Sequence, residues 1–395
     1  MRTYQVGSVL YLESGSANDS ARIGVETAWG GTIVEASVNG TNFVNRHDTG
    51  REVQPAFRDG NREGWNPTLG GDGWNQGTPT ISWSVGPTSL YTKAQPLLWE
   101  PDKNGGGFGL PVAGDLIVEQ AITAVVNEPH TFKVHYKVVH LGNDLHANTG
   151  SQEFPAVYTN RDYHRFIYYD GTAPWTNGAV SEYAFAPYTG SPQLYVPERW
   201  GALVDANNLG LTAFVPDQYP YVIGFAAPDT GGGTATDNYT NYFAMLGELT
   251  IGPGFVLEAD VYLIPGDYVS ARKTVYRLHR MLGMADIFAP AGATDAPSSG
   301  NELTGSTNVS GWTLDDHGVA TVEVLMDGTS DGIATYGDAR PDVGQTFPHA
   351  PTNIGYQYLL DTTKFTNGRH VLNVRCTDTS GNVAILPDVV VNFAN

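Results

Sequence analysis

Cysteine is almost absent from this chain of 395 residues, in which Cys376 is the only one. A single cysteine excludes an intrachain disulfide and any metal site built from several thiolates. Cys376 lies in the alternating segment 374–378, where its position predicts a core residue. With 41% hydrophobic residues, the chain can instead bury an ordinary hydrophobic core.

Basic residues are also scarce, since 21 Lys and Arg stand against 41 Asp and Glu, for a net charge of −20. Such a surface repels nucleic acid and anionic membranes, so we expect neither as a partner. No run approaches the roughly 18 apolar residues of a membrane span, and residues 1–9 lack the apolar segment of a signal peptide. We interpret the chain as secreted or cell-surface, with its signal peptide absent from this sequence.

What is abundant is glycine, with 47 residues, and proline, with 24, while charged residues make up only 16%. Many short strands joined by tight turns need this composition. Thr32–Val38 is rich in β-branched residues, and Asn39-Gly40 then offers a type I′ turn. Successive strands with short turns predict an all-β fold with a large antiparallel sandwich.

The chain divides by pattern into two domains. Apolar spacing over Asp267–Leu282 predicts one helix that closes a large domain of residues 1–289. Residues 290–300 have the composition of a linker. In residues 301–395, short strands and turn signals predict an immunoglobulin-like sandwich. The segments Gly311–Asp316, Val322–Gly328 and Arg375–Asn382 resemble the immunoglobulin-like modules of bacterial exported enzymes and surface proteins.

Asn45–Gln54 is the densest polar segment. If its second half is extended, Glu52 and Gln54 share one face and Arg51 lies on the other. Carboxylates and amides bind sugar hydroxyls in pairs, so we predict Asp48 and Glu52 as catalytic and Arg51 and Gln54 as substrate-binding. In the structural alternative, Arg51 bridges Asp48 and Glu52 within a turn.

A second polar segment covers His146–His164. Glu153 would share an apolar strand face with Val157, which suits a carboxyl group used in acid–base catalysis. The alternative is a salt bridge from Glu153 to Arg161 or Arg199. The further candidates of this segment are His146 and His164 for catalysis, and Gln152, Tyr158 and Arg161 for substrate binding.

Several tryptophans lie in loop-like segments rich in glycine, asparagine and proline, among them Trp65 and Trp74. A flat aromatic face stacks on the apolar face of a sugar ring. We therefore predict Trp65, Asn66 and Trp74 as substrate-binding residues. The alternative is that the tryptophans seal the ends of the core.

The sequence predicts no cofactor and no catalytic metal. His130, His135 and His140 are close in sequence, but strand parity places His135 opposite the other two. A structural calcium ion, held by Asp and backbone oxygens around Gly70–Gly73, is the one alternative.

The opening stretch Ala28–Glu35 and the hairpin into Asn45 resemble the galactose mutarotase-like supersandwich. This group includes aldose epimerases, glycoside hydrolases and polysaccharide lyases. The resemblance spans most of residues 2–290 and implies a carbohydrate partner. The histidine-containing signatures of the epimerases have no clear counterpart here.

We predict an enzyme that cleaves a polysaccharide or oligosaccharide, with hydrolysis as the preferred reaction. The carboxylate pair would be Glu153 with Glu52 or Asp48. One alternative is a polysaccharide lyase that acts on uronic acids, in which an arginine neutralises the carboxylate of the sugar. The other is a non-catalytic glycan-binding or surface structural protein. The sequence does not define the sugar, its linkage or the oligomeric state.

Overall fold

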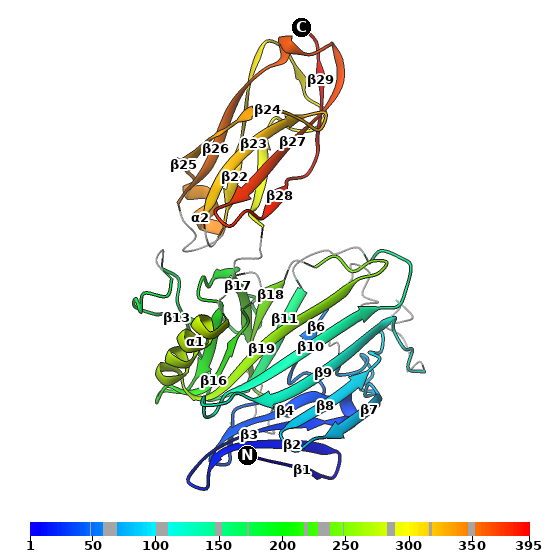
Figure 1. The fold of residues 1–395 in the computed structure, drawn as a ribbon, viewed down its shortest axis with the longest axis vertical. Helices are drawn as coiled ribbons and strands as arrows, with labels where there is room; N and C mark the ends of the chain where they lie inside the picture. The colour runs from blue at the N-terminus through cyan, green and yellow to red at the C-terminus, as the bar shows by residue number, and fades with distance from the viewer. Residues whose placement is uncertain are drawn as a thin grey trace. The chain divides into compact units, whose positions relative to one another are not determined.

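The computed structural model (Figure 1) forms two compact units, Met1–Leu282 and Gly283–Asn395. The residues that it describes are 1–47, 49–57, 69–99, 110–146, 152–171, 174–216, 220–227, 238–247, 249–282, 289–315, 318–346 and 352–395.

Two antiparallel sheets build the first unit. The strands of the ten-stranded sheet are, in spatial order, β1 (Arg2–Val6), β2 (Val9–Ser16), β3 (Asp19–Glu26), β4 (Thr32–Val38), β6 (Val53–Ala56), β11 (Gln152–Asn160), β18 (Thr240–Gly247), β17 (Tyr221–Ala227) and β14 (Leu194–Tyr195), with β5 (Thr41–Asn42) beside β4. The nine-stranded sheet runs β13 (Ser181–Ala184), β12 (Arg165–Tyr168), β15 (Trp200–Val204), β16 (Leu209–Phe214), β19 (Val256–Asp267), β10 (Phe132–His140), β9 (Leu116–Ala124), β8 (Ser89–Ala94) and β7 (Thr80–Val85).

The main core lies between these sheets. Residues alternate strictly between buried and half-buried along β9 and β10, as expected for strands with one face on a core. The strands β6 and β11 differ, because residues on both of their faces are buried. Val157 belongs to the main core, whereas Ala56, Ala156 and Tyr242 form a separate cluster. We call the side of this cluster the outer face of the ten-stranded sheet.

Local predictions hold well in this unit. Strand β4 covers Thr32–Val38 and is followed by Asn39 and Gly40, both with positive φ (49° and 84°), as a type I′ turn requires. Helix α1 covers Tyr268–Leu282. The Asp267 carboxylate accepts the Ser270 N–H at 2.9 Å and caps the start of the helix. No helix among the described residues is long and apolar enough to cross a membrane.

A buried carboxylate anchors helix α1. Glu198 accepts hydrogen bonds from Arg272 Nε at 3.1 Å, from Trp200 Nε1 at 2.8 Å and from the Tyr276 hydroxyl at 2.5 Å. Burial and the bond to Glu198 raise the pKa of Tyr276 to about 12. The buried Glu198 carboxylate is therefore paired with groups of the helix, as stability requires.

The second unit is a smaller two-sheet sandwich with its own core. One sheet contains β20 (Ala291–Ala296), β22 (Ser306–Leu314), β26 (Asn353–Asp361) and β25 (Thr335–Ala339). The other contains β21 (Glu302–Leu303), β29 (Val389–Phe393), β27 (Gly368–Asp378), β23 (Val319–Met326) and β24 (Thr329–Ile333), with β28 (Val383–Ile385) beside β27. Short helical segments are η1 (Thr27–Trp29) in the first unit, and α2 (Pro341–Thr346) and η2 (Thr362–Lys364) in the second.

The predicted fold class is confirmed. Among the described strands every pairing is antiparallel except that of β21 with β29. Cys376 is fully buried in the core of the second unit, as its alternating segment predicted. Burial raises the pKa of its thiol.

The linker prediction for residues 290–300 is wrong in part, because Ala291–Ala296 is strand β20 and pairs with β22. Its alanines and glycine are small because the two strands approach closely. A Cβ on Gly292 would collide with the Trp312 carbonyl oxygen, and one on Gly311 with that of Ala293. The small residues of this segment, which are typical of a linker, here allow two strands to pack closely. The second unit therefore begins before residue 301, and the first ends at Leu282.

Candidate functional site

Tertiary structure brings the two polar segments of the sequence together. Strand β6 pairs with β11, so that Ala56 lies opposite Glu153 and Gln54 opposite Ala156. Because directly opposed residues share a face, Gln54 and Glu153 lie on the outer face of the ten-stranded sheet. The prediction that Glu153 shares a face with Val157 is wrong, because the register shifts between Glu153 and Ala156 and Val157 belongs to the main core. Glu52 adjoins them, since its carbonyl oxygen accepts the Tyr158 N–H at 2.9 Å.

These side chains are deeply buried, and two of them hold neighbouring backbone. Exposure is 1% for Glu52 and 2% for Glu153. The Glu52 carboxylate accepts the Gly50 N–H at 2.8 Å, and Gln54 Oε1 accepts the Leu69 N–H at 2.6 Å. Glu52 and Gln54 thus position the loops on either side of the strand.

The strand register separates the two predicted catalytic carboxylates. Glu52 lies four residues along the chain from Ala56, the partner of Glu153, which is roughly 13 Å of extended strand. A hydrolase pair needs carboxyl groups about 5 to 9.5 Å apart. The hydrolytic pair stays a prediction, with its members on one face but offset along it.

Beside this region lies a pocket of about 350 Å³, lined by His47, Thr49, Arg51, Gly70, Asp72, Gly73, Asn75 and Trp99. We call it the Arg51–Trp99 pocket, because the Arg51 guanidinium lies 4.5 Å from the centre of a Trp99 ring. This distance is that of a cation–π contact. Arg51, predicted to bind substrate, is therefore in a pocket together with an aromatic residue that the sequence did not single out.

Glycine and aspartate shape one wall of this pocket. The Asp72 carboxylate accepts the N–H groups of Trp74 and Gln76, both at 3.0 Å, and the Gln76 side-chain amide at 2.8 Å. Gly50 has a φ of +92° and contacts Gly70 so closely that neither position has room for a Cβ. Asp72 is the carboxylate available around Gly70–Gly73 among the described residues, and it already organises the loop. The structural calcium ion stays a prediction.

The remaining predicted residues are spread along β11 or fall outside the described part. Tyr158 packs against Tyr242 on the outer face, with ring centres 4.8 Å apart and the ring planes tilted by 48°. Arg161 lies over the Tyr239 ring at 5.2 Å, and exposed His164 contacts the Asp162 carbonyl at 3.1 Å. Arg161 and His164 follow the C-terminal end of β11, whereas Gln152 and Glu153 begin it. Asp48, Trp65 and Asn66 lie outside the described residues.

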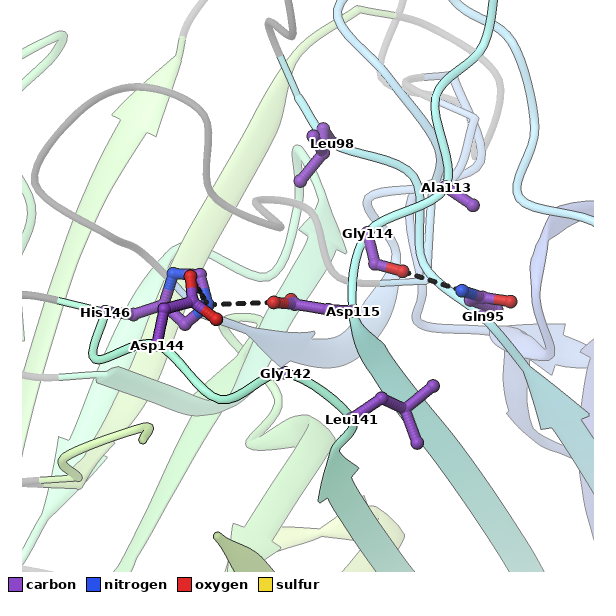
Figure 2. Close-up of a pocket in the computed structure, with 9 residues that line it drawn as sticks. All are labelled: Gln95, Leu98, Ala113, Gly114, Asp115, Leu141, Gly142, Asp144 and His146. Atoms are coloured by element: carbon purple, nitrogen blue, oxygen red, sulfur yellow. Dashed lines mark hydrogen bonds and ion pairs between the residues drawn. The ribbon is translucent and has the colours of Figure 1, made fainter. Parts of the chain in front are cut away.

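His146 belongs to a different constellation, of which Figure 2 draws Asp115, Asp144 and His146. Its Nε2 lies 3.1 Å from Asp115 Oδ2 and 3.2 Å from His140 Nε2, and His140 Nε2 lies 2.9 Å from the same Asp115 oxygen. Asp144 completes what we call the Asp–His group, with carboxylate oxygens 3.7 Å from His140 and 3.6 Å from His146. One ligand atom from each of the four residues lies within 4.8 Å of the others.

The fold brings these residues from three segments. Asp115 immediately precedes β9, His140 ends β10, and the antiparallel register pairs His140 with Leu116. His146 is held through its backbone N–H, which donates to the Ile251 carbonyl at 2.9 Å. Burial lowers the pKa of His140, but hydrogen bonds with Gly252 and Asp115 outweigh it and raise the pKa overall. Burial likewise opposes the hydrogen bonds to His140 and His146 that lower the pKa of Asp115.

A cavity of about 480 Å³ opens beside the Asp–His group. Asp115, Asp144 and His146 line it together with Gln95, Leu98, Ala113, Gly114, Leu141 and Gly142. In Figure 2, Asp115 points toward His146 from a separate segment of the chain. The group is therefore accessible to a small solute.

Sequence reasoning missed most of this group. Strand parity holds for two of the three histidines, since His135 is half-exposed with Asp260 as its partner at 2.8 Å, while the His140 side chain is fully buried. It does not apply to His130, which precedes β10 and pairs with Asp19. The partners of His140 are not neighbouring histidines of the strand but Asp115, Asp144 and His146. The spacing of His140, Asp144 and His146 at the end of a strand was the available signal.

The comparisons with known proteins concern both units. The family model described as bacterial Ig domain matches residues 290–374, which confirms the immunoglobulin-like module. No curated protein matches the chain.

Solved structures resemble the chain only distantly. The GalM/aldose epimerase homologue from C. elegans is 11% identical, covers 65% of this chain and 98% of its own, and has a TM-score of 0.38. Heparan sulfate lyase HepC from Pedobacter heparinus is 9% identical, with a TM-score of 0.37, 79% of this chain covered and 41% of its own. The endo-beta-1,4-mannanase from Thermotoga petrophila is 15% identical, with a TM-score of 0.21, 31% of this chain covered and 24% of its own.

The chain thus spans less than half of the lyase and about a quarter of the mannanase. An epimerase homologue and a polysaccharide lyase belong to the groups that the sequence resemblance named.

Proposed function

We propose that residues 1–282 bind and cleave a carbohydrate, with the Arg51–Trp99 pocket as the glycan site. The observation that carries this proposal is the guanidinium of Arg51 lying over Trp99 in a pocket of about 350 Å³, a size typical of small-ligand sites. Aromatic rings stack on sugars, and hydroxyl, amide and guanidinium groups bind sugar oxygens. His47, Thr49 and Asn75 supply such polar groups in the lining.

The residues of this pocket favour the lyase reaction. A guanidinium binds a carboxylate through two parallel hydrogen bonds and neutralises its charge. Arg51 would hold the carboxylate of a uronic acid, and the exposed imidazole of His47 would remove the proton from the adjacent carbon. The electron pair released forms a carbon–carbon double bond as the bond to the glycosidic oxygen breaks. That oxygen takes up a proton from water and leaves as a hydroxyl group.

Hydrolysis by Glu153 and Glu52 is the second candidate. It is supported by the burial of both carboxylates on one face of adjacent strands. Against it stand their offset along that face and the bond from the Gly50 N–H to Glu52. In the pocket itself, the Asp72 carboxylate already accepts three hydrogen bonds and is poorly placed to act as acid or nucleophile.

The test is a panel of neutral and uronic-acid polysaccharides, with new reducing ends and the ultraviolet absorbance of an unsaturated product measured together. We expect both signals on a uronic-acid glycan. Arg51→Ala should lower kcat/KM by about 10²-fold, the scale of a lost charge-stabilising group. Arg2→Ala is the matched control, because Arg2 also lies over an aromatic ring, Tyr4 at 5.0 Å, but on exposed strand β1.

Two outcomes would overturn the lyase proposal. Reducing ends without the absorbance signal, lost in Glu153→Gln and kept in Arg51→Ala, would establish the hydrolase instead. Binding without either signal, abolished by Trp99→Ala, would establish a non-catalytic glycan-binding protein.

A further inference from the structure

We propose that the Asp–His group of Asp115, His140, Asp144 and His146 binds one divalent transition-metal ion, for which zinc is the best fit. Zinc favours imidazole nitrogen and carboxylate oxygen in a four-coordinate shell. Calcium and magnesium prefer shells built of oxygen alone, which makes two imidazoles in one group a poor site for either. This inference does not depend on the proposed glycan site.

The spacing of three ligand atoms matches one face of a tetrahedron. Metal–ligand bonds of about 2.0 to 2.1 Å place neighbouring ligand atoms about 3.3 Å apart. Between the atoms of Asp115, His140 and His146 the distances are 2.9, 3.1 and 3.2 Å. The Asp144 carboxylate lies slightly farther off, at 3.6 and 3.7 Å from the two rings, and its side chain is 66% exposed. Asp144 can therefore close on an ion with little rearrangement.

The hydrogen bonds behind His140 orient it as a ligand. Its Nδ1 lies 2.7 Å from the Gly252 carbonyl oxygen, which can only accept, so Nδ1 carries the hydrogen. In its neutral form, the ring then directs the lone pair of Nε2 into the group. A backbone carbonyl behind a histidine is the usual arrangement that orients a metal ligand. His140 is fully buried, so this orientation is held by packing as well.

A histidine binds a metal ion in its neutral form, and in that form the electron pairs of the group converge. His140 Nε2 faces a carboxylate oxygen at 2.9 Å and a second imidazole nitrogen at 3.2 Å. Asp115 Oδ1 is buried and has no hydrogen-bond partner in the described part of the chain. A cation at the centre would offset this repulsion and the desolvation of the carboxylate.

A metal ion here would join the segment before β9 to the end of β10 and to the loop that follows. Such a link stabilises the first unit, because binding to the folded state shifts the folding equilibrium. Because three of the ligands also line the cavity of about 480 Å³, chelators and metal ions should exchange at the site without unfolding.

The experiment uses the full chain, treated with EDTA, dialysed and titrated with zinc chloride. We expect one zinc per chain by elemental analysis, a higher Tm after zinc addition, and a tetrahedral cobalt absorption spectrum when Co²⁺ replaces zinc. His146→Ala and Asp144→Asn should weaken zinc binding, the first by at least about 100-fold, since loss of even an outer partner costs 10- to 100-fold. Asp144 is exposed, so its substitution tests the site without disturbing the core.

The matched control is His135→Ala. His135 lies on the same strand, β10, but it pairs with Asp260 and is not part of the Asp–His group. This variant should bind zinc as the unchanged chain does. The proposal is overturned if the chain binds no zinc at micromolar concentration. It is also overturned if His146→Ala and His135→Ala bind zinc equally well.

Discussion

At the scale of single residues, the hydrogen bonds of each imidazole ring decide what that histidine can do. His135 is half-exposed on β10 and pairs with one carboxylate. Five residues along, His140 is buried and directs Nε2 at two potential ligands. His370, in the second unit, is a third case: its Nδ1 lies 2.6 Å from Asp327 Oδ2 and its Nε2 lies 2.8 Å from the Thr366 carbonyl. Both its nitrogens can donate only when the ring is protonated.

His370 should make the stability of the second unit depend on pH. The hydrogen bond with Asp327 raises the pKa of His370 in the folded state. A raised pKa contributes stability that is complete below the unfolded pKa of about 6.5 and is lost as pH rises through the folded value. Hydrogen bonds from Val371 and His370 lower the pKa of Asp327, whose contribution is therefore constant above pH 5 or so.

We accordingly expect the free energy of unfolding of residues 283–395 to fall between about pH 6 and pH 8, measured by urea unfolding at a series of pH values. His370→Gln should flatten this slope, and His135→Gln, in the other unit, should leave it unchanged. If the free energy of unfolding has the same pH slope in His370→Gln and in the unchanged chain, the His370–Asp327 pair does not contribute to the pH dependence of stability.

At the scale of elements, strand β6 holds in place the two loops that form a wall of the proposed glycan site. Its Gln54 side chain holds both the Gly50 carbonyl, which accepts from Nε2, and the Leu69 N–H. The two flanking loops meet at Gly50 and Gly70, and a Cβ on Gly70 would overlap the Gly50 carbonyl oxygen. The wall of the Arg51–Trp99 pocket therefore depends on a glycine contact.

Substituting Gly70 by alanine should disturb this wall. We expect a loss of about 1 to 3 kcal/mol in the free energy of unfolding, the usual cost of overpacking, and weaker glycan binding, measured by urea unfolding and by titration with the active glycan. Gly190→Ala is the control, because a Cβ there meets nothing within 4 Å. Equal stabilities for the two variants would mean that the contact can relax freely.

Elements with local signals were predictable, and those defined by distant partners were not. The hairpin at Asn39-Gly40 and helix α1 follow from turn chemistry and from apolar spacing within one segment. Strand β20 was missed because its small residues carry no strand signal of their own. They become a strand by packing on β22.

At the scale of the whole molecule, the net charge of −20 acts against the anionic glycan that Arg51 is proposed to bind. The electric field of the protein at long range depends on salt, since the Debye length falls from about 30 Å at an ionic strength of 0.01 M to about 8 Å at 0.15 M. The Arg51 guanidinium attracts the glycan carboxylate at contact distance, whereas the net negative charge of the protein repels the glycan at longer range. Added salt should therefore weaken the long-range repulsion more than the contact with Arg51.

We expect the KM for a uronic-acid glycan to fall severalfold as NaCl rises from about 0.01 to 0.15 M, with kcat nearly constant, in steady-state assays. A neutral oligosaccharide of the same length should show no such dependence in a binding titration. A KM that rises with salt would mean that local attraction outweighs the overall repulsion.

The sequence by itself determined the all-β class, the immunoglobulin-like module, the burial of Cys376 and the residues worth testing around Glu52 and Glu153. These features follow from composition and from periodicity within short segments. Tertiary structure alone decided which side chains meet. Antiparallel pairing of β9 with β10 brings Asp115 to His140, and the register of β6 on β11 offsets Glu52 from Glu153. Strand register is set by the packing of whole sheets, so one sequence segment cannot reveal it.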